Sequence, residues 1–251
     1  MNDLVGDFSG DFSGLPGGAL VVGGSGGIGA AVADLLEERG ATVGVTFRTR
    51  EVSGRPAWHL DLADPASAAD VVRRAAEELG GLHTLVHASG PHVPMRHLSR
   101  VGAGEMAEQL HQDAAGFFAV ATAVLPALRA SRGVLVAVTT AATARFPVRD
   151  GLSSAPKAAV EAMVRALAAE EGRYGVRVNC VGPGMLTDGM AARLIDSGEL
   201  DEHALAVTRG NIPLRRFGSA GDVAEAVAYL ASPRASFITG QKLDVDGGYT
   251  V

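Results

Sequence analysis

A cluster of glycines near the start of the chain has the spacing of a phosphate-binding turn. The segment Gly23–Gly29 follows a short apolar run and opens a helical pattern. Glycines permit a tight turn and a close approach of backbone to a pyrophosphate, while the helix N-terminus offers free N–H groups to the phosphates. A plain glycine turn is the alternative, but the position between strand and helix favours a dinucleotide cofactor. The expected contacts are Gly23, Ser25, Gly26, Gly27, Ile28 and Gly29.

Two arginines at the end of the next expected strand bear on which dinucleotide is bound. An acidic residue at this place would accept hydrogen bonds from the adenosine ribose and repel a 2′-phosphate. Arg48 and Arg50 instead attract that phosphate, so the sequence favours NADP(H), with NAD(H) still possible. The alternative is that both guanidinium groups are merely solvated. We expect Arg48 and Thr49 to contact the cofactor, and Asp61 and Leu62, after the third strand, to meet its adenine edge.

The elements that would position these residues alternate between short apolar runs and helical patterns. This alternation predicts an α/β fold of the Rossmann type, with a doubly wound parallel sheet. Continuous apolar runs such as 134–138 suit strands that are buried on both faces. The expected strands are Ala19–Val22, Thr42–Phe47, Leu82–His87, Val134–Thr139, Val176–Val181 and Leu243–Val245, and the expected helices are Ile28–Arg39, Pro65–Leu79, Glu105–Arg129, Pro156–Tyr174 and Asp222–Leu230.

The length of 251 residues, 47% of them hydrophobic, suits a single domain, which we place at residues 17–251. Residues 1–16 contain a tandem Gly-Asp-Phe-Ser, at 6–9 and 10–13, and their polarity and glycine content predict a flexible arm rather than a docking element. The stretch near 185–212 has no clean assignment. We expect it to form a lid over the carboxyl edge of the sheet.

Charge and cysteine content exclude several classes of partner. A formal net charge of −6 argues against a nucleic-acid or acidic-membrane surface, and no run is apolar enough to span a bilayer. The first residues lack the basic region of a secretory signal, and the single cysteine, Cys180, excludes an internal disulfide. We therefore expect a cytoplasmic protein. No metal site is expected either, because His83, His87, His92 and His97 lack a neighbouring carboxylate or cysteine cluster.

Together these motifs resemble those of the short-chain dehydrogenase/reductase family over nearly the whole chain. The glycine turn matches the family's Gly-x-x-x-Gly-x-Gly, and Asp61 matches its adenine-contacting aspartate. Residues 179–184 match the turn that passes over the nicotinamide, and 213–218 and 238–248 match two C-terminal signatures. The resemblance implies a homodimer or homotetramer. It also places Ala88, Ser89, Gly90, Lys157, Pro183, Gly184, Met185 and Thr187 at the cofactor.

The catalytic positions depart from the family pattern. The family usually has Asn, Ser, Tyr and Lys in that order, whereas this chain has Asp113, Thr140, Ser153 and Lys157. The resemblance implies that Lys157 holds the nicotinamide ribose and that Thr140 orients the substrate carbonyl. Ser153 cannot replace the phenol as proton donor, because an aliphatic alcohol is a far weaker acid than tyrosine, with its pKa of ~10. Asp113 either assists a proton relay or, as we favour, is a satisfied polar group of its helix.

The missing phenol leaves the origin of the proton as the main question. Tyr174 lies 17 residues beyond Lys157, which is about 25 Å along a helix, and Tyr249 would serve only across a subunit interface. Water is one donor. A phenolic hydroxyl beside the carbonyl of the substrate is another, because it matches tyrosine in acidity and is oriented by binding. Polycyclic aromatic polyketides carry that arrangement, and the departure resembles that of angucyclinone ketoreductases.

The leading interpretation is an NADPH-dependent ketoreductase of a bulky aromatic polyketide. Its rival is a catalytically silent NADP(H)-binding sensor or scaffold, but the retained Lys157 and the hydroxyl of Thr140 favour an enzyme. An enoyl reductase is a weaker alternative, because that branch places a tyrosine where this chain has Asp150. Phe146 would either stack on an aromatic ligand or join the core. The residues expected around the substrate are His92, Arg145, Phe146 and Met185.

Overall fold

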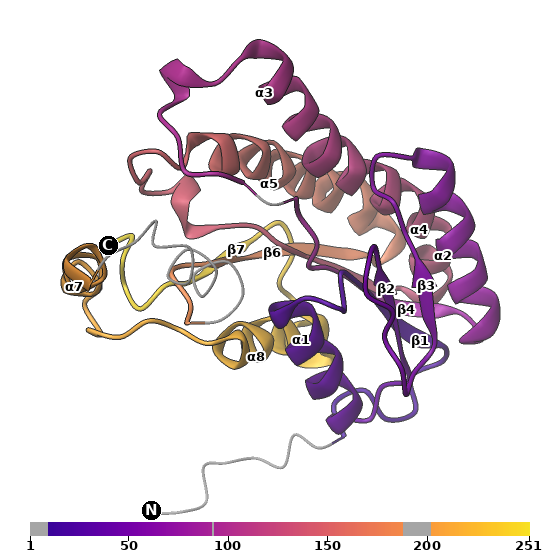
Figure 1. Ribbon diagram of the computed structural model, residues 1–251. Helices are drawn as coiled ribbons and strands as arrows, with labels where there is room; N and C mark the ends of the chain where they lie inside the picture. The colour runs from indigo at the N-terminus through magenta and orange to yellow at the C-terminus, as the bar shows by residue number, and fades with distance from the viewer. Residues whose placement is uncertain (1–9, 92, 188–201) are drawn as a thin grey trace, which may run out of the picture.

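The computed structural model describes residues 10–91, 93–187 and 202–251. Seven parallel strands form one sheet in the order β3-β2-β1-β4-β5-β6-β7 (Figure 1). The predicted doubly wound sheet of the Rossmann type is therefore confirmed. The strands are β1 (Gly18–Val22), β2 (Val43–Phe47), β3 (Ala57–His59), β4 (Leu82–His87), β5 (Val134–Val138), β6 (Arg177–Pro183) and β7 (Lys242–Val245).

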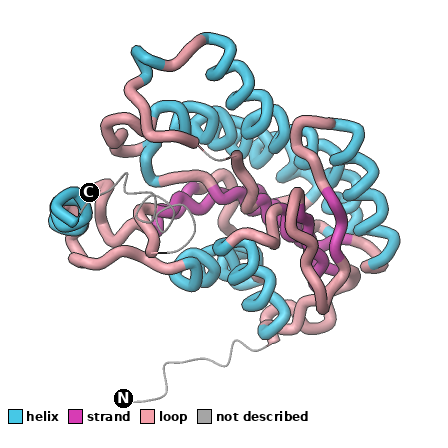
Figure 2. Tube along the Cα trace, viewed as in Figure 1, coloured by secondary structure: helices cyan, strands magenta, loops and turns pink. Residues whose placement is uncertain are grey.

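Helices cover both faces of the sheet (Figure 2). Helices α1 and α8 pack against each other on one face, while α2, α4 and α5 pack on the other. A short π-helical turn, η2 (His111–Ala115), joins α3 to α4, and 3-10 turns lie at η1 (Leu98–Arg100), η3 (Ala141–Thr143), η4 (Gly172–Tyr174) and η5 (Pro233–Ala235). The α-helices are α1 (Gly27–Glu38), α2 (Pro65–Glu78), α3 (Ala103–Leu110), α4 (Gly116–Ser131), α5 (Gly151–Glu171), α7 (Glu202–Gly210) and α8 (Ala220–Ala231).

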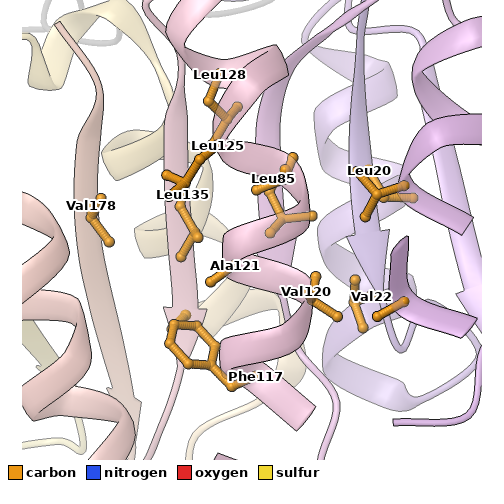
Figure 3. Packing of buried hydrophobic residues seen from close by; sticks show 14 of the residues in the cluster. Leu20, Val22, Leu85, Phe117, Val120, Ala121, Leu125, Leu128, Leu135 and Val178 are labelled. Carbon is orange, nitrogen blue, oxygen red and sulfur yellow. The ribbon is translucent and has the colours of Figure 1, made fainter. Parts of the chain in front are cut away.

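The core consists of two apolar layers, one on each side of the sheet. Every residue of β5 is buried, as its continuous apolar sequence requires of a central strand. Figure 3 shows the layer beneath α4, where Phe117, Val120 and Leu125 of the helix pack in one cluster with Val22, Leu85 and Leu135 of the strands. Phe117 is fully buried, so the start of α4 is held firmly against the sheet.

The apolar face of α4 corrects one expectation. The continuous helical stretch Ala103–Ser131 is long and apolar enough to cross a bilayer by length and composition, although no such run was expected. Its apolar residues have a different explanation, since Phe117, Val120 and Val124 are buried against the sheet. Packing in the core of the domain accounts for the hydropathy of this helix.

The second Gly-Asp-Phe-Ser copy is docked rather than flexible. Phe12 is only 1% exposed and stacks on the ring of His83, with 6.2 Å between ring centroids. The backbone N–H of Phe12 donates to Arg39 O at 3.0 Å, and the Asp11 carboxylate lies 3.3 Å from Nη1 of Arg234. The expectation of a loose arm is thus wrong for residues 10–14, because an aromatic side chain fills a pocket on the domain. The first copy lies outside the described residues.

One further boundary, the start of α5, differs from expectation near the site. Helix α5 begins at Gly151 and not at Pro156, so the proline lies inside the helix and Asp150 becomes its N-cap residue. Proline favours the first helical turn, which is why the sequence suggested a later start. Of the expected lid, the structure describes residues 185–187 and 202–212, and the remainder lies outside the described residues.

Candidate active site

A cleft of about 730 Å³ opens at the carboxyl ends of β1, β2 and β4. The strand order reverses between β1 and β4, and ligands of open α/β sheets bind at such a switch point. Most of the residues predicted to bind the cofactor line this cleft, although their binding role remains a prediction. They are Gly23, Ser25, Gly26, Gly27, Arg48, Thr49, Asp61, Leu62, Ala88, Ser89 and Gly90.

The glycine turn is shaped so that backbone rather than side chains faces the cleft. Gly23 has a φ of +87°, and a Cβ there would lie 2.9 Å from the Cβ of Ser89. A Cβ on Gly29 would lie 2.2 Å from Gly23 O, so this glycine lets α1 approach the turn. No side chain caps the N-terminus of α1 at Gly26. The free N–H groups and the open backbone fit a pyrophosphate, and Gly29 and Ile28 shape the turn without lining the cleft.

Both arginines after β2 line the cleft and are exposed. Nη2 of Arg50 donates to Ser25 O at 2.8 Å, which links the end of β2 to the glycine turn. A guanidinium group at this place can bind a phosphate on the ribose through two parallel hydrogen bonds. Arg50 therefore deserves equal rank with Arg48 as a candidate phosphate ligand.

The prediction missed several residues that also line the cleft. Thr46 is informative, because its Oγ1 accepts a hydrogen bond from Gly23 N at 3.1 Å and so ties β2 to the turn. A polar residue inside an apolar strand was the available signal. The other missed residues lie next to predicted ones along the chain: Val22, Phe47, Leu60, Ala63, Pro91 and Gln112.

Lys157 forms a buried ion pair with Asp113. Its Nζ lies 2.8 Å from Oδ1 of Asp113 and 3.5 Å from Ser89 O, and a Cβ on Gly90 would lie 3.2 Å from this Nζ. The Asp113 side chain is 3% exposed. Asp113 is thus a satisfied polar group of a helical segment, as favoured, with the site lysine of α5 as its partner. Its part in a proton relay stays a prediction. The π-helical turn η2 presents the carboxylate, and such turns occur often at functional sites.

Thr140 and Ser153 lie on the elements that flank this pair. Thr140 follows β5, and its Oγ1 accepts a hydrogen bond from Ala142 N at 3.1 Å. A hydroxyl that accepts in this way still has its own hydrogen to donate to a carbonyl oxygen. Ser153 is half-buried on α5, four residues before Lys157. Its side chain is far shorter than a tyrosine ring, so the position carries no acid comparable with a phenol.

The residues expected around the substrate differ in their surroundings: Arg145 contacts the C-terminal segment, and Phe146 is exposed. Arg145 is held by the C-terminal segment, since its Nη1 donates to Tyr249 O at 2.7 Å and its guanidinium stacks on the Tyr249 ring. Phe146 is 63% exposed, so the core alternative is wrong and the ring is available to a ligand. His92 lies outside the described residues. Tyr249, which was considered as a proton donor across a subunit interface, contacts Arg145 of its own chain.

The turn after β6 lies apart from the described cleft. Pro183 pairs with Val245 of β7, and Gly184 follows it with no room for a side chain, because a Cβ would lie 2.8 Å from Asp246. Met185 O accepts from Gly218 N at 3.0 Å, and Thr187 N donates to Gly218 O at 2.9 Å. These contacts fix residues 185–187 beside α8. The predicted cofactor contacts of these residues remain predictions, because none of them lines the cleft.

Two titratable groups near the site have shifted pKa values. Burial lowers the pKa of His87 to about 3, with a smaller contribution from the charge of Lys157. Burial raises the pKa of Asp150 to about 6. The sequence singled out Asp150 only as the place where enoyl reductases carry a tyrosine. Within the described ranges, no group of three or more His, Cys, Asp or Glu side chains could hold a metal ion.

Comparisons with known proteins agree with this arrangement. Residues 22–250 match the family described as enoyl-(acyl carrier protein) reductase. The chain is 35% identical to cis-4-hydroxycyclohexanecarboxylate dehydrogenase of Sinomonas cyclohexanicum, over 92% of this chain and 96% of the relative. It is 32% identical to 3-oxoacyl-(acyl-carrier-protein) reductase FabG of Vibrio cholerae, with the same coverage. A solved short chain dehydrogenase from Burkholderia cenocepacia in complex with NADP has a TM-score of 0.84 at 29% identity, covering 98% of this chain and 100% of that one.

Proposed function

Because the chain belongs to the short-chain dehydrogenase/reductase family of oxidoreductases, we propose that it is an NADPH-dependent ketoreductase. The observation that carries the proposal is the Lys157–Asp113 pair, which holds an ammonium group beside Ser89 and Gly90 of the cleft. A protein that only sensed the cofactor could use this lysine as well, but it would not need the hydroxyl of Thr140, which still has a hydrogen to donate to a substrate carbonyl. The enzyme is therefore favoured over the silent sensor or scaffold.

Each cofactor-facing group has a definite task in this proposal. When bound, NADPH supplies the hydride. The glycine turn and the N-terminus of α1 hold the pyrophosphate, and Arg48 and Arg50 bind the 2′-phosphate that distinguishes NADPH from NADH. Lys157 holds the nicotinamide ribose, and Asp113 keeps its ammonium group in place. Use of NADH remains the alternative for the cofactor.

The substrate we propose is a polycyclic aromatic polyketide of the angucyclinone type. Thr140 donates a hydrogen bond to its carbonyl oxygen, and the exposed ring of Phe146 offers a stacking surface. Ser153 leaves the protein without a phenol at the usual place, so the proton comes from a hydroxyl beside the ketone or from water. We further propose that the protein acts in the cytoplasm as a homodimer or homotetramer.

NADPH oxidation with two matched polycyclic quinones tests the proposal. One quinone carries a hydroxyl beside the ketone and the other lacks it. We expect the hydroxylated compound to be reduced much faster, because a positioned acid contributes about 10²–10⁴-fold in rate. Equal rates would contradict assistance by the substrate. NADPH binding without any turnover, across a panel of aromatic ketones, would favour the silent sensor.

A further inference from the structure

The side chain of Asp150 does not perform the task that its position would assign to it. An aspartate at a helix N-cap normally accepts hydrogen bonds from the first backbone N–H groups of the helix. Here the side chain makes no capping hydrogen bond. The N–H groups of Ser153 and Ser154 donate to the backbone carbonyl of Asp150, at 3.0 and 2.9 Å, as in any helix start. The carboxyl group therefore remains available for another role.

Asp150 lies on the side of α5 that faces the site. Seven residues separate it from Lys157, which is two helical turns, so both residues share one face at a spacing of about 10 Å along the axis. That face points toward the cleft, because Nζ of Lys157 lies 3.5 Å from Ser89 O. Ser153, where the usual proton donor is missing, lies between them. Asp150 is thus one turn beyond the vacant position of the acid.

The residue before Asp150 has a strained backbone, and the start of α5 is held by neighbouring segments. Arg149 has a φ of +76°, a left-handed conformation that side chains other than glycine rarely adopt. Its Nη2 donates to Met95 O at 3.1 Å, which ties the start of α5 to the segment before η1. Leu98 of η1 packs on Gly151, where an added Cβ would lie 2.5 Å from the leucine side chain. Burial raises the pKa of the Asp150 carboxyl to about 6.

We propose that Asp150 is a second proton source of this site, which protonates ketones that lack a neighbouring hydroxyl group. The inference rests on the proposed function and extends its substrate range. Hydride adds to the carbonyl carbon, and the π electron pair moves onto the oxygen. The Asp150 carboxylic acid gives its proton to this alkoxide, directly or through one water, and the resulting carboxylate regains a proton from solvent. Substrates with a neighbouring phenol supply their own proton and do not depend on Asp150.

The test combines the two matched quinones with an Asp150→Asn variant. Asparagine preserves size and polarity and is an accepted N-cap residue, but it has no acidic proton. We expect the slow reduction of the compound without the hydroxyl to fall by about 100-fold, and that of the hydroxylated compound to stay within about twofold. Asp150→Glu, which keeps a carboxyl group, should recover part of the lost rate. Glu170→Gln is the matched control, because Glu170 is an exposed carboxylate on the same helix.

Each outcome has a separate meaning. Loss of both activities in Asp150→Asn, or of neither, would overturn the inference while the proposed function stands. NADPH binding by fluorescence shows whether the variant is folded, since Asp150 does not line the cofactor cleft. A wild-type protein that reduces only the hydroxylated compound would also refute the role of Asp150. Failure of the wild type on both compounds would overturn the inference together with the proposed function.

Discussion

The cofactor cleft and the residues around Lys157 differ in how closely they match the family pattern. Around the cofactor cleft, the glycine turn and the strand ends follow the family pattern, and the backbone of the turn shapes the cleft. Around the substrate, Asp113, Thr140 and Ser153 all replace the family's usual residues, and side chains make the geometry. Backbone therefore shapes the cleft side of the site, whereas side chains that differ from the family's usual residues surround Lys157 on the other side.

Breaking the Lys157–Asp113 pair should give the largest effect. Lys157→Met leaves the buried Asp113 carboxylate without its partner, which costs ~3–5 kcal/mol for a buried ion pair. Urea unfolding at neutral pH measures this loss. The double variant Asp113→Asn with Lys157→Met should recover much of the stability, because no charge is left unpaired, but not the NADPH oxidation. Full stability of Lys157→Met would show that the pair contributes little.

Acid should lower the free energy of unfolding through protonation of His87. Its pKa is about 3 when folded and 6.5 in the ordinary state, so the unfolded chain binds the proton more tightly. This contribution to stability is complete above pH 6.5 and is lost as pH falls below it, by about 1.4 kcal/mol per pH unit. His87→Asn should therefore lose stability less steeply between pH 7 and 5. His97→Asn, which changes an exposed histidine, should leave the slope unchanged, and equal slopes in both variants would contradict the assignment.

On the cofactor side, Arg48 and Arg50 should determine the preference for NADPH over NADH. Arg48→Ala and Arg50→Ala should each weaken NADPH binding by about tenfold, while NADH binding changes little, because only NADPH carries the 2′-phosphate. Fluorescence titration with both cofactors gives the two affinities. Arg74→Ala, at an exposed position on α2, is the control. Equal losses for NADPH and NADH would mean that the arginines support the turn and do not select the cofactor.

Replacing Ser153 should have the smallest effect. Ser153→Ala removes only a weakly acidic hydroxyl, so steady-state reduction of the hydroxylated quinone should stay within about twofold of the wild type. A loss near 100-fold would instead make Ser153 an essential proton relay. The reverse change, Ser153→Tyr, should raise the rate on the compound without the hydroxyl.

The sequence predicted the residues that line the cleft better than the contacts around Lys157. Turns, strand ends and glycines are local signals, so Gly23, Arg48 and Asp61 could be placed at the cleft, while their cofactor contacts stay predictions. The pairing of Asp113 with Lys157 joins residues 44 positions apart and depends on a π-helical turn, which no short pattern announces. The start of α5 was misplaced because Pro156 resembles a first-turn proline. For that reason the sequence did not predict Asp150 as the N-cap of this helix.

The docked Phe12 has a consequence for the order in which the protein is made. Its binding surface combines Arg39 and His83 with a salt link from Asp11 to Arg234, close to the end of the chain. Synthesis proceeds from the N-terminus, and domains generally begin to fold before the chain is complete. Residues 11 and 12 must therefore wait until Arg234 has left the ribosome before all their contacts exist. The contact between Asp11 and Arg234 therefore forms later in synthesis than the contacts of Phe12 with Arg39 and His83.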